Sequence, residues 1–481
     1  MPQSKRISPF GFRDKIGYLF GDFGNDFTFI LSTTILMKFY TDAIGISAGV
    51  IGTIMMIARF VDAFTDVAMG RICDRSETKP GVGKFRPWIL KMCIPVALSS
   101  FLIYQSRASG LAYGLRVAYL AVTYILWSSV FYTSINIPYG SMASAISPEP
   151  GDRQSLSTYR SMGAALAGTV IGFALPIFAY EKVDGAERLV GARVTQIAGV
   201  FSLLAVACYL LCYFLTRERV IAASDGTRAH RTSVLHMLRS AAGNRALLSI
   251  IAATVVMLLA QLTMQNMAGY IYPDYYNNAT AQSASTLLMM AGMLIAAALA
   301  KPLAARFGKA EISIASNVFA ALICLLTYVL RPASVWVFVA LQGLCWLGLG
   351  MFTMVSWALI TDVIDYAEIR NGVREDGSIY ALYSFARKLG QAVSAGATGW
   401  LLTLIGYVSG ASGGQTPQVL GGIFAISTLV PAVGFALLAA VLWLWYPLKK
   451  RQVEENVALL REKHAAQHEE GQRDSEKAGG Q

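Results

Sequence analysis

Five ionisable side chains lie inside long apolar segments near the N-terminus: Asp22, Asp26, Arg59, Asp62 and Asp66. A charged group near the centre of a bilayer costs roughly 3 kcal/mol or more, so such residues need partners and are candidates for function. Asp22 and Asp26 are four residues apart and share one face of a helix. Asp62 and Asp66 have the same spacing. Two carboxylates this close repel each other, so in a low-dielectric interior either one is protonated or a cation lies between them.

A hydroxyl group on another apolar segment fits the same chemistry. Thr133 would add a neutral oxygen if it faces the same cavity, and hard cations such as Na⁺ prefer oxygen ligands. We therefore interpret Asp62, Asp66 and Thr133 as a candidate cation site that could hold Na⁺. One alternative stays open, in which Arg59 forms a structural ion pair with Asp62 and leaves Asp66 at the water-facing end of the helix.

The segment Tyr132–Ser141 places polar groups and a proline inside an otherwise apolar run. Pro138 frees a backbone carbonyl, which membrane interiors tolerate where the gap lines a cavity. Asn136, inside this segment, is a candidate ligand for a substrate, although a packing kink without a ligand would give the same pattern. Arg160 and Lys388, near the starts of later apolar runs, are the cationic counterparts, unless they extend to the lipid headgroups.

The composition identifies the elements that must position these residues. Hydrophobic side chains make up 55% of the 481 residues and charged ones only 14%, with a mean hydropathy of +0.50. Soluble chains contain about 25% charged residues, so a soluble enzyme is excluded. Apolar runs of about 20 residues, each able to cross a bilayer as a helix, recur along the chain. We predict twelve transmembrane spans, at residues 16–40, 44–70, 88–106, 112–145, 160–180, 194–216, 246–271, 282–304, 312–330, 335–360, 379–407 and 419–446.

The distribution of positive charge predicts the orientation of these spans. The net charge of +11 could suggest a nucleic-acid partner. Most Lys and Arg residues, however, concentrate in alternate connections between the spans, as in the cytoplasmic loops of membrane proteins. The connections on the other side hold Arg107, Arg116, Lys182, Arg188, Arg193 and Arg331. We therefore expect both termini in the cytoplasm and no nucleic-acid partner.

The longest weakly hydrophobic connection, Thr216–Arg245, divides the spans six and six. The stretch Tyr159–Gly168 matches Ala386–Ala395, with Arg160 over Arg387. Chance could produce so short a match in a chain rich in Ala and Gly, but its place at the starts of the fifth and eleventh spans favours a duplication. We predict an N-terminal six-helix bundle (1–216), a central cytoplasmic loop (217–245), a C-terminal six-helix bundle (246–448) and a cytoplasmic tail (449–481).

Sequence signatures of enzymes and metal sites are weak. The chain has no phosphate-binding loop of the Gly-x-x-x-x-Gly-Lys-Ser/Thr type and no His-Glu-x-x-His zinc motif. All six Cys lie in or beside apolar spans, which favours buried free thiols over disulfides or a metal cluster. We therefore expect a protein that is not an enzyme and that uses no cofactor apart from a co-transported ion.

Several stretches resemble the glycoside-pentoside-hexuronide cation symporters, a family of the major facilitator superfamily. They are Gly21–Phe27, Ala58–Asp66, Gly83–Leu90, Tyr132–Ser141 and Asp362–Ala392. The similarity extends from about Lys15 to Pro447, and the last stretch is highly specific. It implies an all-α membrane protein with the major facilitator fold, in which two pseudo-repeated six-helix bundles hold the substrate between them near the middle of the membrane.

The resemblance also implies roles for single residues. The family's cation ligands match Asp62, Asp66 and Thr133. Its sugar-binding positions match Asp26, Asn136, Arg160 and Lys388. At Asn136 and Gly140 the melibiose-carrying members have an Asp and a Trp, so this pocket is expected to be roomier and less acidic. In this respect the chain is closer to the glucuronide-carrying members, and an acidic sugar could use Arg160 or Lys388.

Together these features predict a carrier in the bacterial inner membrane that imports a glycoside with Na⁺ or H⁺ by alternating access, most closely a glucuronide or hexuronide. Two alternatives stay open. One is a symporter for a neutral glycoside or pentoside, since Asp26 is retained. The other is a carrier of the same fold that exports or exchanges without a cation. The expected partners are a small sugar and membrane lipid, with no obligate protein partner.

Overall fold

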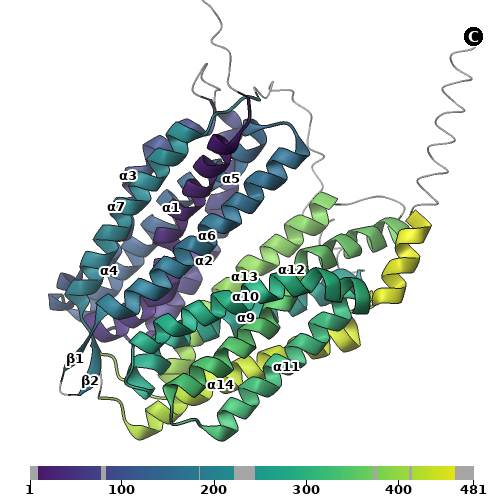
Figure 1. Ribbon diagram of the computed structural model, residues 1–481. Coiled ribbons are helices and arrows are strands. Elements are labelled where there is room, and N and C mark those ends of the chain that lie inside the picture. Colours follow the sequence, from purple (N-terminus) through teal and green to yellow (C-terminus); the bar gives the residue numbers. More distant parts are fainter. Residues whose placement is uncertain are drawn as a thin grey trace, which may run out of the picture.

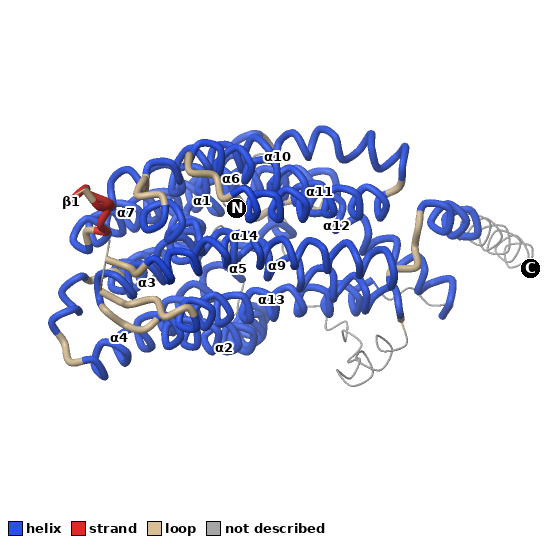
Figure 2. The backbone as a smooth tube through the Cα atoms, turned by 90° about the horizontal axis from the view of Figure 1, so that it is seen from below, coloured by secondary structure: helices blue, strands red, loops and turns tan. Residues whose placement is uncertain are grey.

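The computed structural model describes residues 9–76, 83–183, 185–220, 244–371, 376–410 and 414–460 of the chain (Figure 1). Almost all of these residues are helical (Figure 2). Helices are expected here because a backbone without water must satisfy its hydrogen bonds within its own segment. The predicted central loop and tail lie largely outside the described residues, at 221–243 and 461–481.

The N-terminal bundle contains six long helical stretches within the described residues. These are α1 (Phe12–Phe39), α2 (Ala48–Arg75), α3 (Arg86–Ile103), α4 (Tyr113–Ile125) continued by α5 (Thr133–Ile146), α6 (Pro150–Ala179) and α7 (Gly191–Leu215). The π-helical segment η3 (Leu126–Tyr132) joins α4 to α5, and the 3-10 segment η2 (Ser106–Gly110) precedes α4. A second π-helical segment, η1 (Tyr40–Ile44), extends α1.

The C-terminal bundle repeats this plan. Its helices are α9 (Arg245–Tyr270), α10 (Thr280–Phe307), α11 (Lys309–Leu330), α12 (Val335–Asn371), α13 (Asp376–Leu404) and α14 (Pro417–Ala440). The π-helical segments η4 (Ile271–Tyr275) and η5 (Val441–Trp445) extend α9 and α14. The first helix of each bundle therefore ends in a five-residue π-helical segment, which is a structural sign of the repeat.

The number of membrane-crossing helices agrees with the prediction. By length and composition alone, ten of the described helical stretches can cross a membrane. The helices α1 and α13, with 28 and 29 residues, are as long as most of these ten. They contain charged residues, among them Asp22, Asp26 and Lys388, which lower their hydropathy. With them, the described residues contain twelve long helical stretches in two bundles of six, as the sequence predicts.

Two helices are longer than the predicted spans. The helix α6 begins at Pro150 rather than at residue 160, and α12 continues to Asn371 rather than ending at residue 360. Hydropathy marks only the apolar part of a helix, whereas the hydrogen-bonded backbone continues into water. Pro150 is at the first turn of α6, a position that proline favours because its missing N–H is not needed there.

A short antiparallel hairpin was not predicted. The strands β1 (Tyr180–Val183) and β2 (Ala186–Leu189) pair with Tyr180 opposite Leu189. Gly185 makes the turn with φ of 80°, a conformation that glycine adopts without strain. We call the end of the molecule that carries this hairpin, η1 and η4 the hairpin end.

The two bundles meet through pseudo-equivalent helices. Across the interface α2 packs on α13, α10 packs on α6, and α1 packs on α9. The crossing of α2 and α13 is close, because a Cβ at Gly52 would lie 3.0 Å from the Ala395 carbonyl oxygen and 3.1 Å from Gly399 Cα. The bundles converge at the hairpin end and diverge towards the opposite end (Figure 1).

The buried core explains why the hairpin end is closed. The apolar core of the N-terminal bundle continues across the interface there, through Tyr270, Tyr272, Phe338 and Phe424 of the C-terminal bundle. The rest of the C-terminal bundle has a core of its own, around Trp346, Phe352 and Phe435. The molecule is therefore joined by apolar packing across the interface at the hairpin end.

Candidate functional site

Two hydroxyl groups face the carboxylates of α2. Ser129 in η3 donates a hydrogen bond of 2.5 Å to Asp62 Oδ1, and Thr133 at the start of α5 donates one of 2.9 Å to Asp66 Oδ1. The Thr133 hydroxyl also lies 3.2 Å from the Ser128 carbonyl oxygen. The structure thus brings Asp66 and Thr133 together, as the sequence predicts. It adds Ser129, whose spacing of four from Thr133 matches that of Asp62 and Asp66.

Each carboxylate of α2 also has a cationic partner. Arg59 Nη1 lies 3.4 Å from Asp62 Oδ2, and the Arg59 guanidinium lies over the Phe29 ring with a separation of 4.9 Å. The Lys388 ammonium of α13 contacts Asp66 Oδ2 across the bundle interface. The ion pair between Arg59 and Asp62 that the sequence left open is therefore present, while Asp66 is bound by the other bundle rather than exposed alone.

A second polar cluster lies on α1 and α6. Arg160 Nε lies 3.0 Å from Asp22 Oδ1, and the Arg160 guanidinium lies 5.4 Å from the centre of the Tyr139 ring. Tyr139 stacks on Tyr18 at 4.6 Å, and each of the two hydroxyls donates to the other residue's carbonyl oxygen. The tyrosine pair supports the guanidinium from one side. The Arg160 side chain is still 39% exposed, so part of it remains accessible to a ligand.

The remaining predicted sugar residues have few contacts. Within the described residues, Asp26 makes no hydrogen bond or ion pair, because Arg160 pairs with Asp22 one turn earlier on α1. Asn136 in α5 is half-buried and likewise makes no hydrogen bond there. A Cβ at Gly140 would lie 3.7 Å from Arg160 Nη1, so the guanidinium occupies space that a large side chain at this position would need. Lys388 lies on Asp66, not in this cluster.

The charges of the two clusters do not balance. Four carboxylates, those of Asp22, Asp26, Asp62 and Asp66, face three cations. The cations are Arg59, Arg160 and Lys388. With all groups ionised, one negative charge remains between the bundles without a cationic partner, which is unfavourable away from bulk water. A bound cation or proton would remove this excess.

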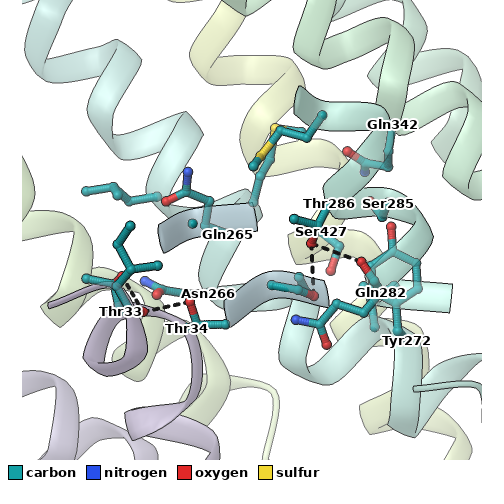
Figure 3. Close-up of a pocket in the computed structure, with 18 of the residues that line it drawn as sticks. Thr33, Thr34, Gln265, Asn266, Tyr272, Gln282, Ser285, Thr286, Gln342 and Ser427 are labelled. Atoms are coloured by element: carbon teal, nitrogen blue, oxygen red, sulfur yellow. Dashed lines mark hydrogen bonds between the residues drawn. The ribbon is translucent and has the colours of Figure 1, made fainter. Parts of the chain in front are cut away.

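A cavity of about 280 Å³ lies between the bundles (Figure 3), and Ile271 and Tyr272 of η4, at the hairpin end, help to line it. Its walls come from both halves, with Thr33 and Thr34 on α1, Gln265 and Asn266 on α9, and others on six more helices. Arg59 is its one charged lining residue among those that the structure describes. None of the predicted sugar residues lines this cavity. Its polar residues are uncharged and widely separated in the chain, so no sequence pattern marks it.

A buried ionic cluster closes the hairpin end beyond this cavity. Lys38 Nζ lies 2.8 Å from Asp42 and 2.5 Å from Asp274, and it is 2.9 Å from the Tyr407 hydroxyl. The Tyr407 hydroxyl donates to Asp42 at 2.7 Å, and Tyr270 presents its ring to Lys38 at 4.6 Å. We call these five residues the hairpin-end cluster. The charged side chains in it are at most 3% exposed, so it is a strong contact between the bundles.

Hydrogen bonds between the two bundles are also concentrated near the hairpin end. Gly49 N–H and Trp400 Nε1 bind hydroxyls of the opposite bundle, and Gly410 N–H donates to the Thr41 carbonyl oxygen. All of these contacts lie towards the hairpin end. In the part of the chain that the structure describes, the pair of Lys388 and Asp66 is the contact farthest from that end. The conformation is therefore closed at the hairpin end.

Comparisons with known proteins agree with this arrangement. The sequence profile of the MFS/sugar transport protein family matches residues 17–450. The glucuronide carrier protein homolog of Escherichia coli is 31% identical over 452 residues, covering 92% of this chain and 94% of that protein. A putative 2,3-dihydroxypropane-1-sulfonate exporter of the same organism is 28% identical, with 92% and 93% covered.

The fold also recurs among solved structures. A bacterial homologue of the human lysosomal transporter Spinster, in an inward-facing and unoccupied conformation, superposes with a TM-score of 0.64 at 12% identity. The match covers 92% of this chain and 97% of the other. At this identity the likeness establishes the fold alone.

Proposed function

The chain belongs to the MFS/sugar transport protein family, and from this premise we propose that it is a cation-coupled symporter that imports a glucuronide or another hexuronide into a bacterial cell. The observation that carries the proposal is the unbalanced charge between the bundles. One Na⁺ or H⁺ at Asp62 and Asp66 would neutralise it, with the hydroxyls of Ser129 and Thr133 as further oxygen ligands for Na⁺.

Lys388 suggests how the cation acts on the rest of the molecule. In this conformation its ammonium takes the place on Asp66 that a transported cation would take. The Lys388 side chain is 45% exposed and that of Asp66 is 19% exposed, so the pair is hydrated and easily broken. A bound cation would release Lys388 and thereby change the contact between α2 and α13. By linkage, sugar that favours the same rearrangement raises the affinity for the cation.

The orientation is part of the proposal. The bias of Lys and Arg places both termini in the cytoplasm, so the hairpin end would face the periplasm. The structure would then represent the state that is closed to the outside. Alternating access requires that the hairpin-end cluster opens when the opposite side closes around sugar and cation.

Two features support an acidic sugar as the substrate. The Arg160 guanidinium is held by Asp22 and Tyr139 but remains partly exposed, and it can bind a carboxylate with paired hydrogen bonds. Gly140 leaves the space around it open. The unpaired Asp26 would accept hydrogen bonds from sugar hydroxyls. A neutral glycoside, which needs no cationic partner, would use Asp26 in the same way and remains the second candidate substrate.

Uptake into proteoliposomes tests the proposal. In vesicles that contain the purified protein, an imposed inward Na⁺ or proton gradient is expected to accelerate uptake of a labelled glucuronide. The rate should be at least tenfold higher than with equal ion concentrations on both sides. Asp62→Asn and Asp66→Asn should abolish the response to the gradient. The matched control Asp152→Asn, at the start of α6 beside Ser147, should leave it unchanged.

The same assay distinguishes the rival functions. Symport would be excluded if neither gradient changes the rate of uptake. It would also be excluded if Asp62→Asn and Asp66→Asn both leave gradient-driven uptake intact. Counterflow of sugar without any cation dependence would then support an exchanger or exporter, which the similarity to a putative sulfonate exporter makes a concrete alternative.

A further inference from the structure

The cavity between the bundles has a wall of carboxamides. Gln265 on α9, Gln282 on α10, Gln342 on α12 and Gln391 on α13 all line it. Gln282 and Gln342 are 5% and 7% exposed. Within the described residues, the side-chain amides of these four glutamines have no hydrogen-bond partner. Each amide offers two donors and an acceptor, and buried polar groups are almost always satisfied. The wall therefore requires water or a ligand with many hydroxyl groups.

The cavity carries little net charge. Arg59, its charged lining residue, is already paired with Asp62 and covered by Phe29. The rest of the described lining combines amides and hydroxyls with aromatic side chains such as Phe338 and Trp346 and with aliphatic and methionine side chains such as Leu262 and Met289. Figure 3 shows Asn266 beside Thr33 and Thr34 on one side, with Gln282 and Gln342 on the other. Amides suit the hydroxyls of a sugar and aromatic rings suit its C–H faces, whereas the one cationic side chain of the described lining, Arg59, already has a carboxylate partner.

The cavity is displaced from the charged cluster along the pathway. Thr33 follows Asp26 by seven residues and lies on the same face of α1, which corresponds to about 10 Å along the helix. Gly168, which also lines the cavity, follows Arg160 on α6 by a similar interval. A single sugar ring cannot contact both regions at once. A ligand of two units can.

We propose that the four glutamines, which we call the amide wall, bind the uncharged polyhydroxyl unit of a two-unit glycoside whose acidic ring lies at Arg160. This inference rests on the glycoside transport proposed above and specifies its substrate as a disaccharide-sized uronoside. The carrier would then prefer such a molecule to the free sugar acid, because its neutral unit makes hydrogen bonds to the amides that the free acid does not make.

Equilibrium binding to the purified full-length protein in Na⁺ tests this inference. The two probes are glucuronic acid and a disaccharide of glucuronic acid linked to a neutral hexose. Wild-type protein is expected to bind the disaccharide at least tenfold more tightly. Gln282→Leu and Gln342→Leu should each weaken disaccharide binding about 5- to 30-fold, as expected for the loss of hydrogen bonds. Binding of the free acid should change less than twofold.

Controls separate this inference from the function on which it rests. Gln154→Leu, at an exposed position of α6, should alter neither affinity. Binding of free acid reports an intact fold, and if a leucine variant does not fold, Gln282→Asn and Gln342→Asn retain the polarity and should weaken the disaccharide selectively. Equal effects on both probes, or no effect on either, would overturn the amide wall. Failure of wild-type protein to bind any acidic or neutral sugar would instead overturn the proposed function.

Discussion

Asp62 and Asp66 lie one turn apart on α2 but are neutralised in different ways. Asp62 is held by Arg59 and Ser129 within its own bundle, and this arrangement does not depend on how the bundles are placed. Asp66 is held by Thr133 from the same bundle and by Lys388 from the other. Of these two carboxylates, only that of Asp66 therefore changes its contacts when the bundles move relative to each other. Its exchange of Lys388 for a cation is the residue-scale event that could link ion binding to movement.

The hydroxyl of Thr133 is the most direct test at this scale. Thr133→Ala removes one oxygen from Asp66 and from any Na⁺ bound there, which should cost about 1–2 kcal/mol, or a 5- to 30-fold loss in Na⁺ affinity. The measurement is the Na⁺ concentration that half-maximally stimulates sugar binding. The neighbouring Ser134 bonds to the Val130 carbonyl oxygen on an exposed face, so Ser134→Ala is the matched control. An unchanged Na⁺ requirement in Thr133→Ala would remove Thr133 from the cation site.

At the scale of elements, the π-helical segments bring distant residues together at the hairpin end. η1 carries Asp42 just beyond Lys38 of α1, and η4 carries Asp274 of the second bundle. Tyr407 follows α13, and its hydroxyl lies 2.7 Å from Asp42 and 3.1 Å from Asp274. Four side chains thus contact one buried ammonium, those of Asp42, Asp274, Tyr407 and Tyr270. Removal of one partner from a buried ionic group costs about 3–5 kcal/mol, because the other charges remain uncompensated.

Lys38→Met should therefore destabilise the closed hairpin end. Thr34→Cys places a thiol in the cavity below the cluster, and the native cysteines are all buried. A membrane-impermeant thiol reagent added from the hairpin side should label Thr34→Cys at least tenfold faster when Lys38→Met is also present. Arg193→Met breaks the exposed pair with Glu181 at the same end but within the N-terminal bundle, so it serves as control. Equal labelling rates with and without Lys38→Met would show that the cluster does not hold this end closed.

The sequence predicts the elements better than their contacts. Each apolar run is long enough to reveal its span, and the carboxylate pairs on α1 and α2 stand out because charge inside such a run is rare. The partners of those charges come from elsewhere. Lys38 meets Asp274 across 236 residues, and Lys388 meets Asp66 across 322. Periodicity carries no information about such pairs. Gln282 and Gln342 were missed because a single amide in an apolar run resembles an ordinary polar substitution.

At the scale of the whole molecule, three polar layers follow one another along the interface. The hairpin-end cluster is outermost, the amide-walled cavity comes next, and the two charged clusters lie deepest. The first layer joins the bundles tightly, whereas the last is hydrated and is joined by the exposed pair of Lys388 and Asp66. This arrangement fits a carrier in which the hairpin-end cluster holds one side of the molecule closed. The charged clusters at the other end would then change their contacts when a ligand binds.

The charge balance leads to a prediction about membrane potential. With one cation bound, the excess negative charge between the bundles is removed, so a hexuronide entering with one cation moves no net charge. A neutral glycoside entering with one cation moves one positive charge. An inside-negative potential of about 100 mV supplies roughly 2.3 kcal/mol per charge, or about 50-fold accumulation. In proteoliposomes we expect this potential to drive accumulation of a neutral glycoside but to change hexuronide accumulation less than twofold, while a Na⁺ or proton gradient drives both. Asp66→Asn should remove both responses. A hexuronide accumulation that rises about 50-fold with potential would require a second cation, and the assignment of one uncompensated charge to Asp22, Asp26, Asp62 and Asp66 would then be wrong.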